Sequence, residues 1–522
     1  MRRKSIEEIK RGKCAYDVWR DIERYAVQGY ETIEPEDLEL FKWFGIYEQR
    51  PRRGYFMVRL RLPGGKLNAK QAACIASAGR AFARGTLDIT TRQDIQFHWV
   101  TLKDIPELFR QLHLASLSTT GSCGDTVRNV VACPLSGRQT GEYINVDSLA
   151  RQINQRFEGN RRYANLPRKF KISLCGCASQ CTVPQLHDLS FYAACKGKGK
   201  NSVHGFNVLA GGGLSTYPSE AVPLDLFVRE EQVADICEAL CRVFSEHGSR
   251  KSRGQSRLKF LVKNWTASRL REELSGIVGH DLEPAAEAPL KEGFFREPVH
   301  IQRQNQKNLN CVPMAATVGR LTPEDLFVAS SVARDFGSGA LRLTLMQNVL
   351  IPDIPNENLD EACDRLALAP TLHINASSLR IGTLACTGFE FCEKAMVETK
   401  QLAASCIDFL EETGVIPAVP IKIAFSGCSN DCGHAQAADI GLRGVQYKDA
   451  DSYMDYFDMI VGTRLGEKPG KGARLGVRIP AEKVASQVAS LVKNFNGNRR
   501  GDESFTDFCR RYFTDEGIEF QI

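Results

Sequence analysis

Apolar and polar residues alternate along several short stretches that we expect to be β-strands. The first is YFMVRLRL, from Tyr55, and the second is LDITTRQDIQFHWV, from Leu87. Between them, residues 68–84 carry apolar side chains at helical spacing. This order of elements predicts a small α+β module in the first part of the chain.

Two further strands are predicted where RKFKISL, from Arg168, and PIKIAF, from Pro420, lead into cysteine-containing loops. Residues 393–414 then have helical periodicity and end on a glycine that can cap a helix. Lys169 and Lys171 are two apart on the first of these strands, so we expect both side chains on one face.

The chain repeats itself at an offset of about 251–254 residues. KISLCGCASQC, from Lys171, matches KIAFSGCSNDC, from Lys422, and RNVVACPLSG around Cys133 resembles RIGTLACTGF around Cys386. The stretch around Arg92 likewise resembles the one around Met346. Matches in the same order at nearly one offset predict a duplication into two pseudo-symmetric halves.

Composition places the chain among globular proteins and gives little sign of nucleic-acid binding. Its 522 residues are enough for three or four domain-sized units, with 43% hydrophobic and 25% charged residues. The net charge is only +6, and the basic clusters are short and interrupted. No apolar run is long enough to cross a bilayer, and the N-terminal residues lack the apolar stretch of a secretory signal. We therefore expect a cytoplasmic protein whose thiols are reduced, with no nucleic-acid or membrane partner.

Four cysteines near the C-terminus have the spacing of an iron–sulfur site. Cys386 and Cys392 form C-x5-C, and about 35 residues later Cys428 and Cys432 form C-x3-C. Four thiolates are what a [4Fe-4S] cube needs. Structural zinc sites usually pair their cysteines as C-x2–4-C on both sides, a rule that only the second pair fits.

The first half keeps cysteines at three of the four equivalent positions but has none where Cys392 would fall. Cys133, Cys177 and Cys181, with Cys175 beside them, either hold a metal or are packed, partly oxidised thiols.

On these motifs the chain resembles the sirohaem-dependent sulfite and nitrite reductase family over residues 40–515. The resemblance implies an internally duplicated α+β fold, in which two ferredoxin-like half-domains form one module beside two related α/β sirohaem/[4Fe-4S] domains. The expected segments are an N-terminal extension (1–45), half-domain 1 (46–115), a diverged sirohaem and substrate domain (116–280), a linker (281–300), half-domain 2 (301–375) and a cluster-ligating domain (376–522).

The same resemblance implies the cofactors and their ligands. Cys386, Cys392, Cys428 and Cys432 would hold the [4Fe-4S] cluster, and the Cys432 thiolate would also bridge to the sirohaem iron. Because sirohaem carries many carboxylates, its site should be rich in basic and amide side chains. The expected contacts are Arg92, Gln96, His98, Asn129, Arg253, Arg257 and Lys259.

The implied reaction is the six-electron reduction of sulfite to sulfide, or of nitrite to ammonia. Four residues match the family's set for binding the oxyanion: Arg61, Arg128, Lys169 and Lys171. Arginine can bind two oxygens at once, and lysine offers a mobile charge and a proton. No flavin or NADPH domain is visible, so we expect electrons from ferredoxin or a similar protein donor.

Sulfite is favoured over nitrite by one pair of residues. In sulfite-reducing members a cysteine five residues before the first-domain arginine lies near a tyrosine and can be joined to it. Here Cys123 precedes Arg128 by five, and Tyr47 is the expected tyrosine. The alternatives are a ferredoxin-nitrite reductase, a dissimilatory sulfite reductase subunit, a precorrin-3B synthase-like enzyme and a non-catalytic iron–sulfur protein.

Overall fold

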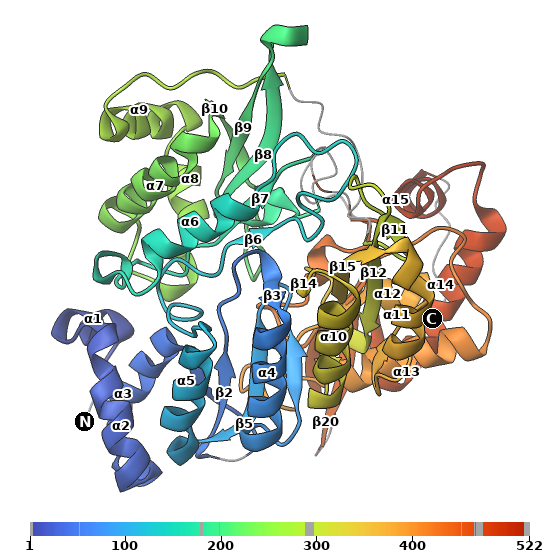
Figure 1. The fold of residues 1–522 in the computed structure, drawn as a ribbon, viewed down its shortest axis with the longest axis horizontal. Coiled ribbons are helices and arrows are strands. Elements are labelled where there is room, and N and C mark those ends of the chain that lie inside the picture. The colour runs from blue at the N-terminus through green and yellow to red at the C-terminus, as the bar shows by residue number, and fades with distance from the viewer. Residues whose placement is uncertain are drawn as a thin grey trace.

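The computed structural model describes residues 4–51, 53–177, 181–197, 199–287, 297–449, 452–463, 465 and 473–515. Within these residues the chain builds four mixed or antiparallel sheets, each covered by helices (Figure 1). Two sheets belong to a ferredoxin-like module and one to each of two cofactor-type domains.

The first sheet of the module has the strand order β1-β2-β5-β4-β13. Its strands are β1 (Ile46–Glu48), β2 (Tyr55–Arg59), β4 (Leu87–Ile89), β5 (Ile95–Thr101) and β13 (Arg320–Leu321). Helices α4 (Ala69–Phe82) and α5 (Ile105–Leu114) belong to this half. The stretch that starts at Leu87 was expected as one strand, but residues 90–94 turn back so that β4 and β5 pair as a hairpin.

The second sheet has the order β11-β12-β15-β14-β3, with β16 paired to β12. Its members are β3 (Lys66–Asn68), β11 (Gln302–Arg303), β12 (Leu309–Ala316), β14 (Ala340–Leu343), β15 (Val349–Pro355) and β16 (Leu372–His373), with helices α10 (Pro323–Phe336) and α11 (Leu359–Leu366). The halves exchange strands, because β3 pairs with β14 and β13 pairs with β4. This reciprocal exchange confirms that the two half-domains form one module.

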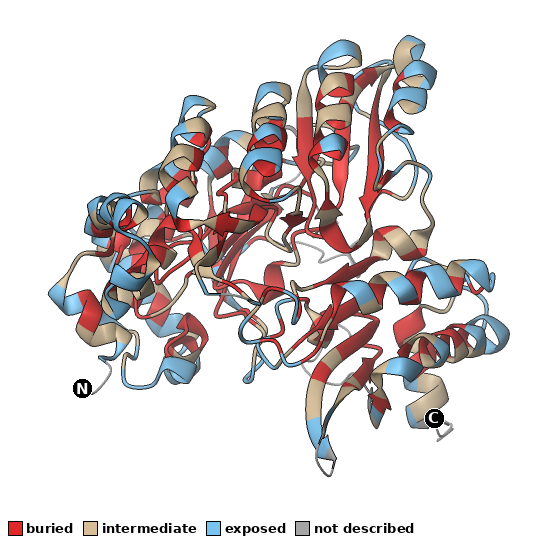
Figure 2. Cartoon of the chain, turned by 90° about the horizontal axis from the view of Figure 1, so that it is seen from below, coloured by how far each residue is buried: buried red, intermediate tan, exposed pale blue. Residues whose placement is uncertain are grey.

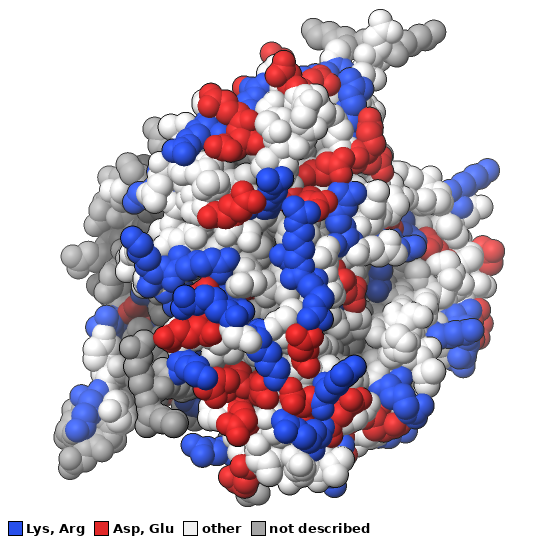
Figure 3. Space-filling view, turned by 90° about the vertical axis from the view of Figure 1, so that its left-hand side faces the viewer, with Lys and Arg blue, Asp and Glu red and all other residues white. Residues whose placement is uncertain are grey.

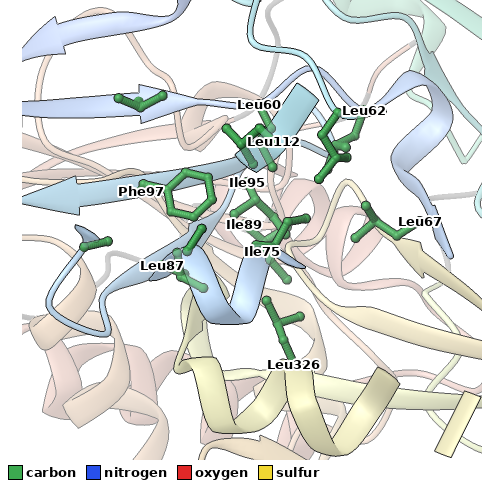
Figure 4. Packing of buried hydrophobic residues seen from close by; sticks show 14 of the residues in the cluster. Leu60, Leu62, Leu67, Ile75, Leu87, Ile89, Ile95, Phe97, Leu112 and Leu326 are labelled. Atoms are coloured by element: carbon green, nitrogen blue, oxygen red, sulfur yellow. The ribbon is translucent and has the colours of Figure 1, made fainter. Parts of the chain in front are cut away.

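One hydrophobic core runs through both halves. Leu326 of α10 lies beside Ile75 of α4 in the same cluster as the strand residue Ile89 (Figure 4). The N-terminal helices α1 (Ile6–Gly12), α2 (Trp19–Gln28) and α3 (Pro35–Leu40) bury residues in this core too, among them Ile22 and Leu40. The predicted extension is therefore packed onto the module.

The two cofactor-type domains repeat one sheet topology. The first has β6 (Val131–Ala132), β7 (Ile172–Cys175), β8 (Leu189–Lys196), β9 (Val203–Ala210) and β10 (Val222–Val228), with α6 (Asp147–Phe157), α7 (Val233–His247), α8 (Leu258–Asn264) and α9 (Ala267–Val278). The second has β17 (Thr383–Ala385), β18 (Ile423–Ser426), β19 (Ile440–Asp449), β20 (Ser452–Val461) and β21 (Ala473–Pro480), with α12 (Ser378–Gly382), α13 (Lys400–Glu412), α14 (Val484–Asn498) and α15 (Phe505–Cys509).

In each domain the strands follow in sequence order across the sheet. The first three strands pair in parallel and the last two pair antiparallel in both copies. Each domain has its own hydrophobic core. The internal duplication predicted from the repeated motifs is thus confirmed at the level of topology.

Two expected elements begin later than the sequence pattern indicates. β7 starts at Ile172, and the preceding Phe170 makes only an isolated bridge to Val127. Helix α13 starts at Lys400 and not near residue 393, because Ala395 and Met396 donate backbone hydrogen bonds to Cys392 and Gly427 of the cysteine loops. Gly414 does follow the helix in the left-handed conformation. Of the expected linker, residues 288–296 lie outside the described residues.

Buried residues line the strands and the inward faces of the helices (Figure 2). On the face drawn in Figure 3, Lys and Arg side chains lie among Asp and Glu side chains. Among the described residues, no helix is both long and apolar enough to span a membrane.

Candidate active site

The four C-terminal cysteines lie on two loops that leave the same edge of one sheet. Cys386 directly follows β17, and the loop with Cys428 and Cys432 follows β18. Because these strands are parallel neighbours, their carboxyl ends meet. The Gly427 N–H donates to Cys386 Sγ at 3.2 Å, and the Met396 N–H donates to the Gly427 carbonyl at 2.8 Å. Backbone hydrogen bonds therefore hold the loops together.

Cys432 lies within electrostatic reach of the other three cysteines. Burial, followed by the nearby Cys432 thiol, raises the pKa of Cys386 to about 12. Burial is also the largest cause of the raised pKa values of Cys392 and Cys428, to which Cys432 contributes as well. Cys432 itself is exposed. Four thiols that converge in this way, three of them only partly buried, fit the four corners of an iron–sulfur cube.

Lys169 and Lys171 reach Cys432 from the opposite domain. They flank Phe170 in the extended segment before β7, and each is influenced by the charge of Cys432. Burial, followed by Arg92 and Arg257, lowers the pKa of Lys171 to about 7. Burial and then the neighbouring Lys171 hold the pKa of Lys169 well below its usual range. No hydrogen-bond partner occupies either ammonium group among the described residues.

Arg59, which no sequence motif singles out, also lies within electrostatic reach of Cys432. It ends β2 opposite Gln96 of β5. Its Nη1 donates to Cys123 Sγ at 3.3 Å and its Nη2 to Gln96 Oε1 at 3.4 Å, whereas its buried Nε has no partner among the described residues. Cys432 and Asp94 are among the charges that raise the pKa of Arg59 against the opposing effect of burial.

Arg61 is expected in the anion-binding set, but its guanidinium group is hydrogen-bonded to other groups of the protein. Its Nε donates to Asn154 Oδ1, and its Nη1 donates to the carbonyls of Gly121, at 3.0 Å, and Val127, at 2.7 Å. Only 3% of the residue is exposed. The backbone leaves β2 after Arg59, so the alternation in VRLRL does not carry Arg61 onto the same surface.

Arg128 lies at the edge of this group. Its guanidinium donates to the carbonyl of Gly124, at 2.6 Å, and to that of Ser122, at 3.1 Å. Its charge also lowers the pKa of Arg92 and of Lys169, so the guanidinium is close to both. We refer to Arg59, Arg92, Arg128, Lys169 and Lys171 together as the cationic cluster.

Arg92 and Asn129 carry buried polar atoms that have no partner among the described residues. Arg92 Nη2 donates to the Asn129 carbonyl, but its buried Nε and Nη1 have no partner among the described residues. Burial lowers the pKa of Arg92 to about 9. Asn129 Nδ2 donates to the Leu62 carbonyl at 2.7 Å, while its buried Oδ1 is without a partner. Thr91 next to Arg92 donates to the Cys432 carbonyl at 3.2 Å.

His98 does not join the cationic cluster. It is fully buried between Gln49 Oε1, at 3.2 Å, and Asp88 Oδ2, at 3.1 Å. Its ring stacks on Phe391, with the ring centroids 4.1 Å apart. His98 therefore packs against the loop that carries Cys392, through its contact with Phe391.

Three of the expected sirohaem contacts, Arg253, Arg257 and Lys259, are hydrogen-bonded to other groups of the protein. Arg253 binds both carboxylate oxygens of Asp125, and Arg257 binds both oxygens of Asp188. Lys259 Nζ donates to three backbone carbonyls, including those of Gly213 and Leu214 at 3.0 Å each. Of the three, Arg257 is among the main charges that lower the pKa values of the lysines of the cationic cluster.

Tyr47 and Cys123 lie next to each other and next to Arg59. Burial raises the pKa of Tyr47 to about 12, and Cys123 is the largest charge that adds to the shift. Cys123 is fully buried and accepts the hydrogen bond from Arg59. Tyr47 and Cys123, the two residues expected to be joined by a cross-link, are thus near each other in the structure.

These residues fit the two cofactors that the motifs imply. The cationic cluster places five basic groups together, and Arg92 and Asn129 keep unpartnered buried atoms. Partly buried cations that repel one another are costly unless an anion compensates them. A polycarboxylate macrocycle and an oxyanion substrate would supply that compensation, beside four cysteines suited to a cube.

Comparison with known proteins agrees with this site. The family model of the nitrite and sulphite reductase 4Fe-4S domain matches residues 123–282 and 377–505. The model of the nitrite/sulfite reductase ferredoxin-like half domain matches residues 47–115 and 301–369.

Relatives cover nearly the whole chain. An assimilatory ferredoxin-dependent nitrite reductase of Haloferax mediterranei is 32% identical, over 97% of this chain and 91% of its own. A sulfite reductase [ferredoxin] of Mycolicibacterium paratuberculosis is 32% identical, over 94% of this chain and 92% of its own. The solved structure of the Mycobacterium tuberculosis NirA protein matches with a TM-score of 0.90 and 30% identity, over 97% of this chain and 96% of that one. The chain therefore belongs to the nitrite and sulfite reductase family, whose members carry sirohaem and a [4Fe-4S] cluster.

Proposed function

We propose that this protein is a ferredoxin-dependent sulfite reductase that carries out the six-electron reduction of sulfite to sulfide. The observation that carries the proposal is the position of Cys432, which lies within electrostatic reach of three further cysteines and of Lys169 and Lys171. A thiolate in this position can belong to the electron-storing site and to the substrate site together. The donor is inferred from the relatives, which are named ferredoxin-dependent enzymes.

When bound, the sirohaem and the cluster supply electrons in single steps to an atom held at the haem iron. Cys386, Cys392, Cys428 and Cys432 would hold the cluster, with Cys432 shared between the two cofactors. Arg92 and Asn129, with their unpartnered buried atoms, would bind the macrocycle's carboxylate side chains.

The remaining residues of the cationic cluster would act on the oxyanion. Arg59 and Arg128 can hold two of its oxygens with their guanidinium groups. Lys169 and Lys171 would supply positive charge and protons, which each cleavage of an oxygen from the substrate requires. A lysine whose pKa is lowered to about 7, as for Lys171, gives up its proton readily near neutral pH.

Sulfite is proposed as the substrate because Tyr47 and Cys123 are found near Arg59. Tyr47 and Cys123 lie together beside this arginine, as the pair is expected to lie in sulfite-reducing members. We propose that the two are joined by a thioether bond, which fixes both side chains and shapes the space next to the arginine.

Nitrite reduction is the second candidate. Relatives named for nitrite and for sulfite are equally similar to the chain, each 32% identical. The cationic cluster suits either oxyanion.

Steady-state kinetics with reduced ferredoxin test the proposal. On protein loaded with sirohaem and cluster, we expect kcat/KM to be higher for sulfite than for nitrite. A preference for nitrite would reassign the substrate and leave the site intact. Absence of both activities from loaded protein would contradict the reductase assignment and favour a precorrin-3B synthase-like or non-catalytic role.

A further inference from the structure

Three buried cysteines of the first cofactor-type domain converge on one point. The Sγ atoms of Cys133, Cys177 and Cys181 all lie within 4.8 Å of one another. Their exposed fractions are 1%, 3% and 8%. None of these cysteines forms a disulfide. Three buried sulfurs this close together could supply three of the ligands of a metal ion.

Cys175 supplies a fourth sulfur. It ends β7, is fully buried, and lies within hydrogen-bonding reach of the thiols of Cys177 and Cys181. Its Sγ now donates to the Cys177 carbonyl at 3.4 Å. Cys175 lies outside the group of sulfurs within 4.8 Å of one another, so it would have to move closer to become the fourth ligand.

The surroundings suit thiolates that are bound to a cation. The Gln139 side-chain amide donates to Cys133 Sγ at 3.3 Å, as the outer groups of a metal site do for a sulfur ligand. Tyr192, Leu209 and Ala221 complete a buried cluster with the cysteines. Water is thereby kept from the sulfurs.

The geometry indicates one ion and not an iron–sulfur cube. A tetrahedral Zn²⁺ with bonds of about 2.3 Å to sulfur holds its thiolates about 3.8 Å apart. In a cube each thiolate binds a different iron, so the sulfurs stand farther apart. Cys386, Cys392, Cys428 and Cys432 show that wider arrangement in the other half of this chain, because no three of them form a group as close as the first-half cysteines.

We propose that Cys133, Cys175, Cys177 and Cys181 form a structural zinc site, in which Zn²⁺ is bound by four thiolates. The spacing of Cys177 and Cys181, C-x3-C, is typical of such sites. The site occupies the position that the iron–sulfur cysteines occupy in the second domain, since Cys133 follows β6 as Cys386 follows β17. One ancestral loop pair thus serves two different metals.

The zinc site would fix the strands that carry part of the cationic cluster. Arg128 and Asn129 lie just before β6, and Lys169 and Lys171 lie just before β7. The proposed ligands lie at the opposite, carboxyl ends of the same two strands. An ion there would hold β6 and β7 in register without touching substrate or sirohaem.

Metal analysis of the purified, tag-free holoprotein tests the proposal. We expect about one zinc per chain, in addition to the roughly five iron atoms of the cluster and the sirohaem. Cys177→Ser combined with Cys181→Ser should reduce zinc at least tenfold and leave the iron of the [4Fe-4S] cluster, which other cysteines would hold, at the wild-type level. Cys237→Ala, which changes a buried cysteine of α7 in the same domain, should keep its zinc.

X-ray absorption at the zinc edge of the wild-type protein needs no variant. It should show four sulfur neighbours at about 2.3 Å. Wild-type protein without zinc, even after growth with added zinc, would overturn the proposal. So would zinc that persists in the double variant, iron above five atoms per chain that is lost from it, or a mass that shows these cysteines joined as disulfides.

Discussion

The Thr91 hydroxyl donates a hydrogen bond of 3.2 Å to the backbone carbonyl of Cys432. Thr91 belongs to the turn between β4 and β5 of the ferredoxin-like module, whereas Cys432 belongs to the second cofactor-type domain. The next residue, Arg92, carries the unpartnered guanidinium atoms of the cationic cluster. One turn of the module therefore positions a cofactor contact and the proposed bridging ligand together.

Exchanging Arg59 for glutamine should impair catalysis and leave the fold intact. Arg59 makes two long hydrogen bonds, and its Nε has no partner in the part of the chain that the structure describes, so the stability of the fold depends little on it. Loss of a charge that stabilises the reacting anion costs about 10²–10³-fold in rate. We expect kcat/KM for sulfite to fall by this amount, with the thermal midpoint unchanged.

Arg61→Gln is the matched comparison. It should destabilise the fold, whereas Arg59→Gln should impair catalysis without destabilising it. The carbonyls of Gly121 and Val127 would lose their buried donor. Unsatisfied buried groups cost about 1–3 kcal/mol each, so the free energy of unfolding should fall by about 2–6 kcal/mol. Thermal unfolding and kinetics of both variants measure the contrast. A stable Arg61→Gln protein with a large loss of activity would return Arg61 to the anion site.

Anion binding should weaken as the pH rises through the pKa of Lys171. Burial, Arg92 and Arg257 lower this pKa to about 7, and only the protonated form attracts an anion. The contribution of Lys171 to anion binding is therefore fully present below about pH 7 and is lost above it. Anionic cofactors favour the charged form and would move the fall to higher pH.

Nitrite is a convenient probe because it stays anionic over this range. Its affinity, followed by the sirohaem absorption, should fall by about 10- to 100-fold, the value of one charge-assisted hydrogen bond. Lys171→Arg keeps its charge and should flatten the profile. The same pH dependence in both proteins would show that another group is responsible.

The thioether between Tyr47 and Cys123 should be visible by mass spectrometry. Its formation is a two-electron oxidation that removes one hydrogen atom from each residue, with an external oxidant such as dioxygen taking up the two electrons and protons. The joined tryptic peptides therefore weigh two hydrogen atoms less than their sum. Cys123→Ala and Tyr47→Phe should both abolish the joined species and lower the ratio of sulfite to nitrite kcat/KM. Recovery of only separate peptides from active wild-type protein would remove the structural argument for sulfite.

The sequence predicts the fold well wherever a pattern is local. Alternating strands and the repeated cysteine motifs indicate the duplicated α+β architecture, because strand and helix periodicity depend on near neighbours. The exchange of β3 and β13 between the halves is not visible in this way. Those strands have three and two residues, and their partners lie in the other half of the module.

Side-chain roles were harder to predict, because partners distant in sequence decide them. Arg257 is engaged by Asp188 and Arg253 by Asp125, and neither carboxylate is near its partner in the chain. The choice between Arg59 and Arg61 depends on where β2 ends, which the alternation does not show.

Cys432 is proposed to be a ligand of both the cluster and the sirohaem. Magnetic coupling between these two cofactors tests that assignment most directly. EPR and Mössbauer spectra of the loaded wild-type protein should show the two centres coupled. Cys432→Ser should abolish the coupling, while Cys406→Ser, a buried cysteine of α13 outside the site, should retain it. Native coupling in the Cys432→Ser protein would contradict the assignment of Cys432 as the bridging ligand.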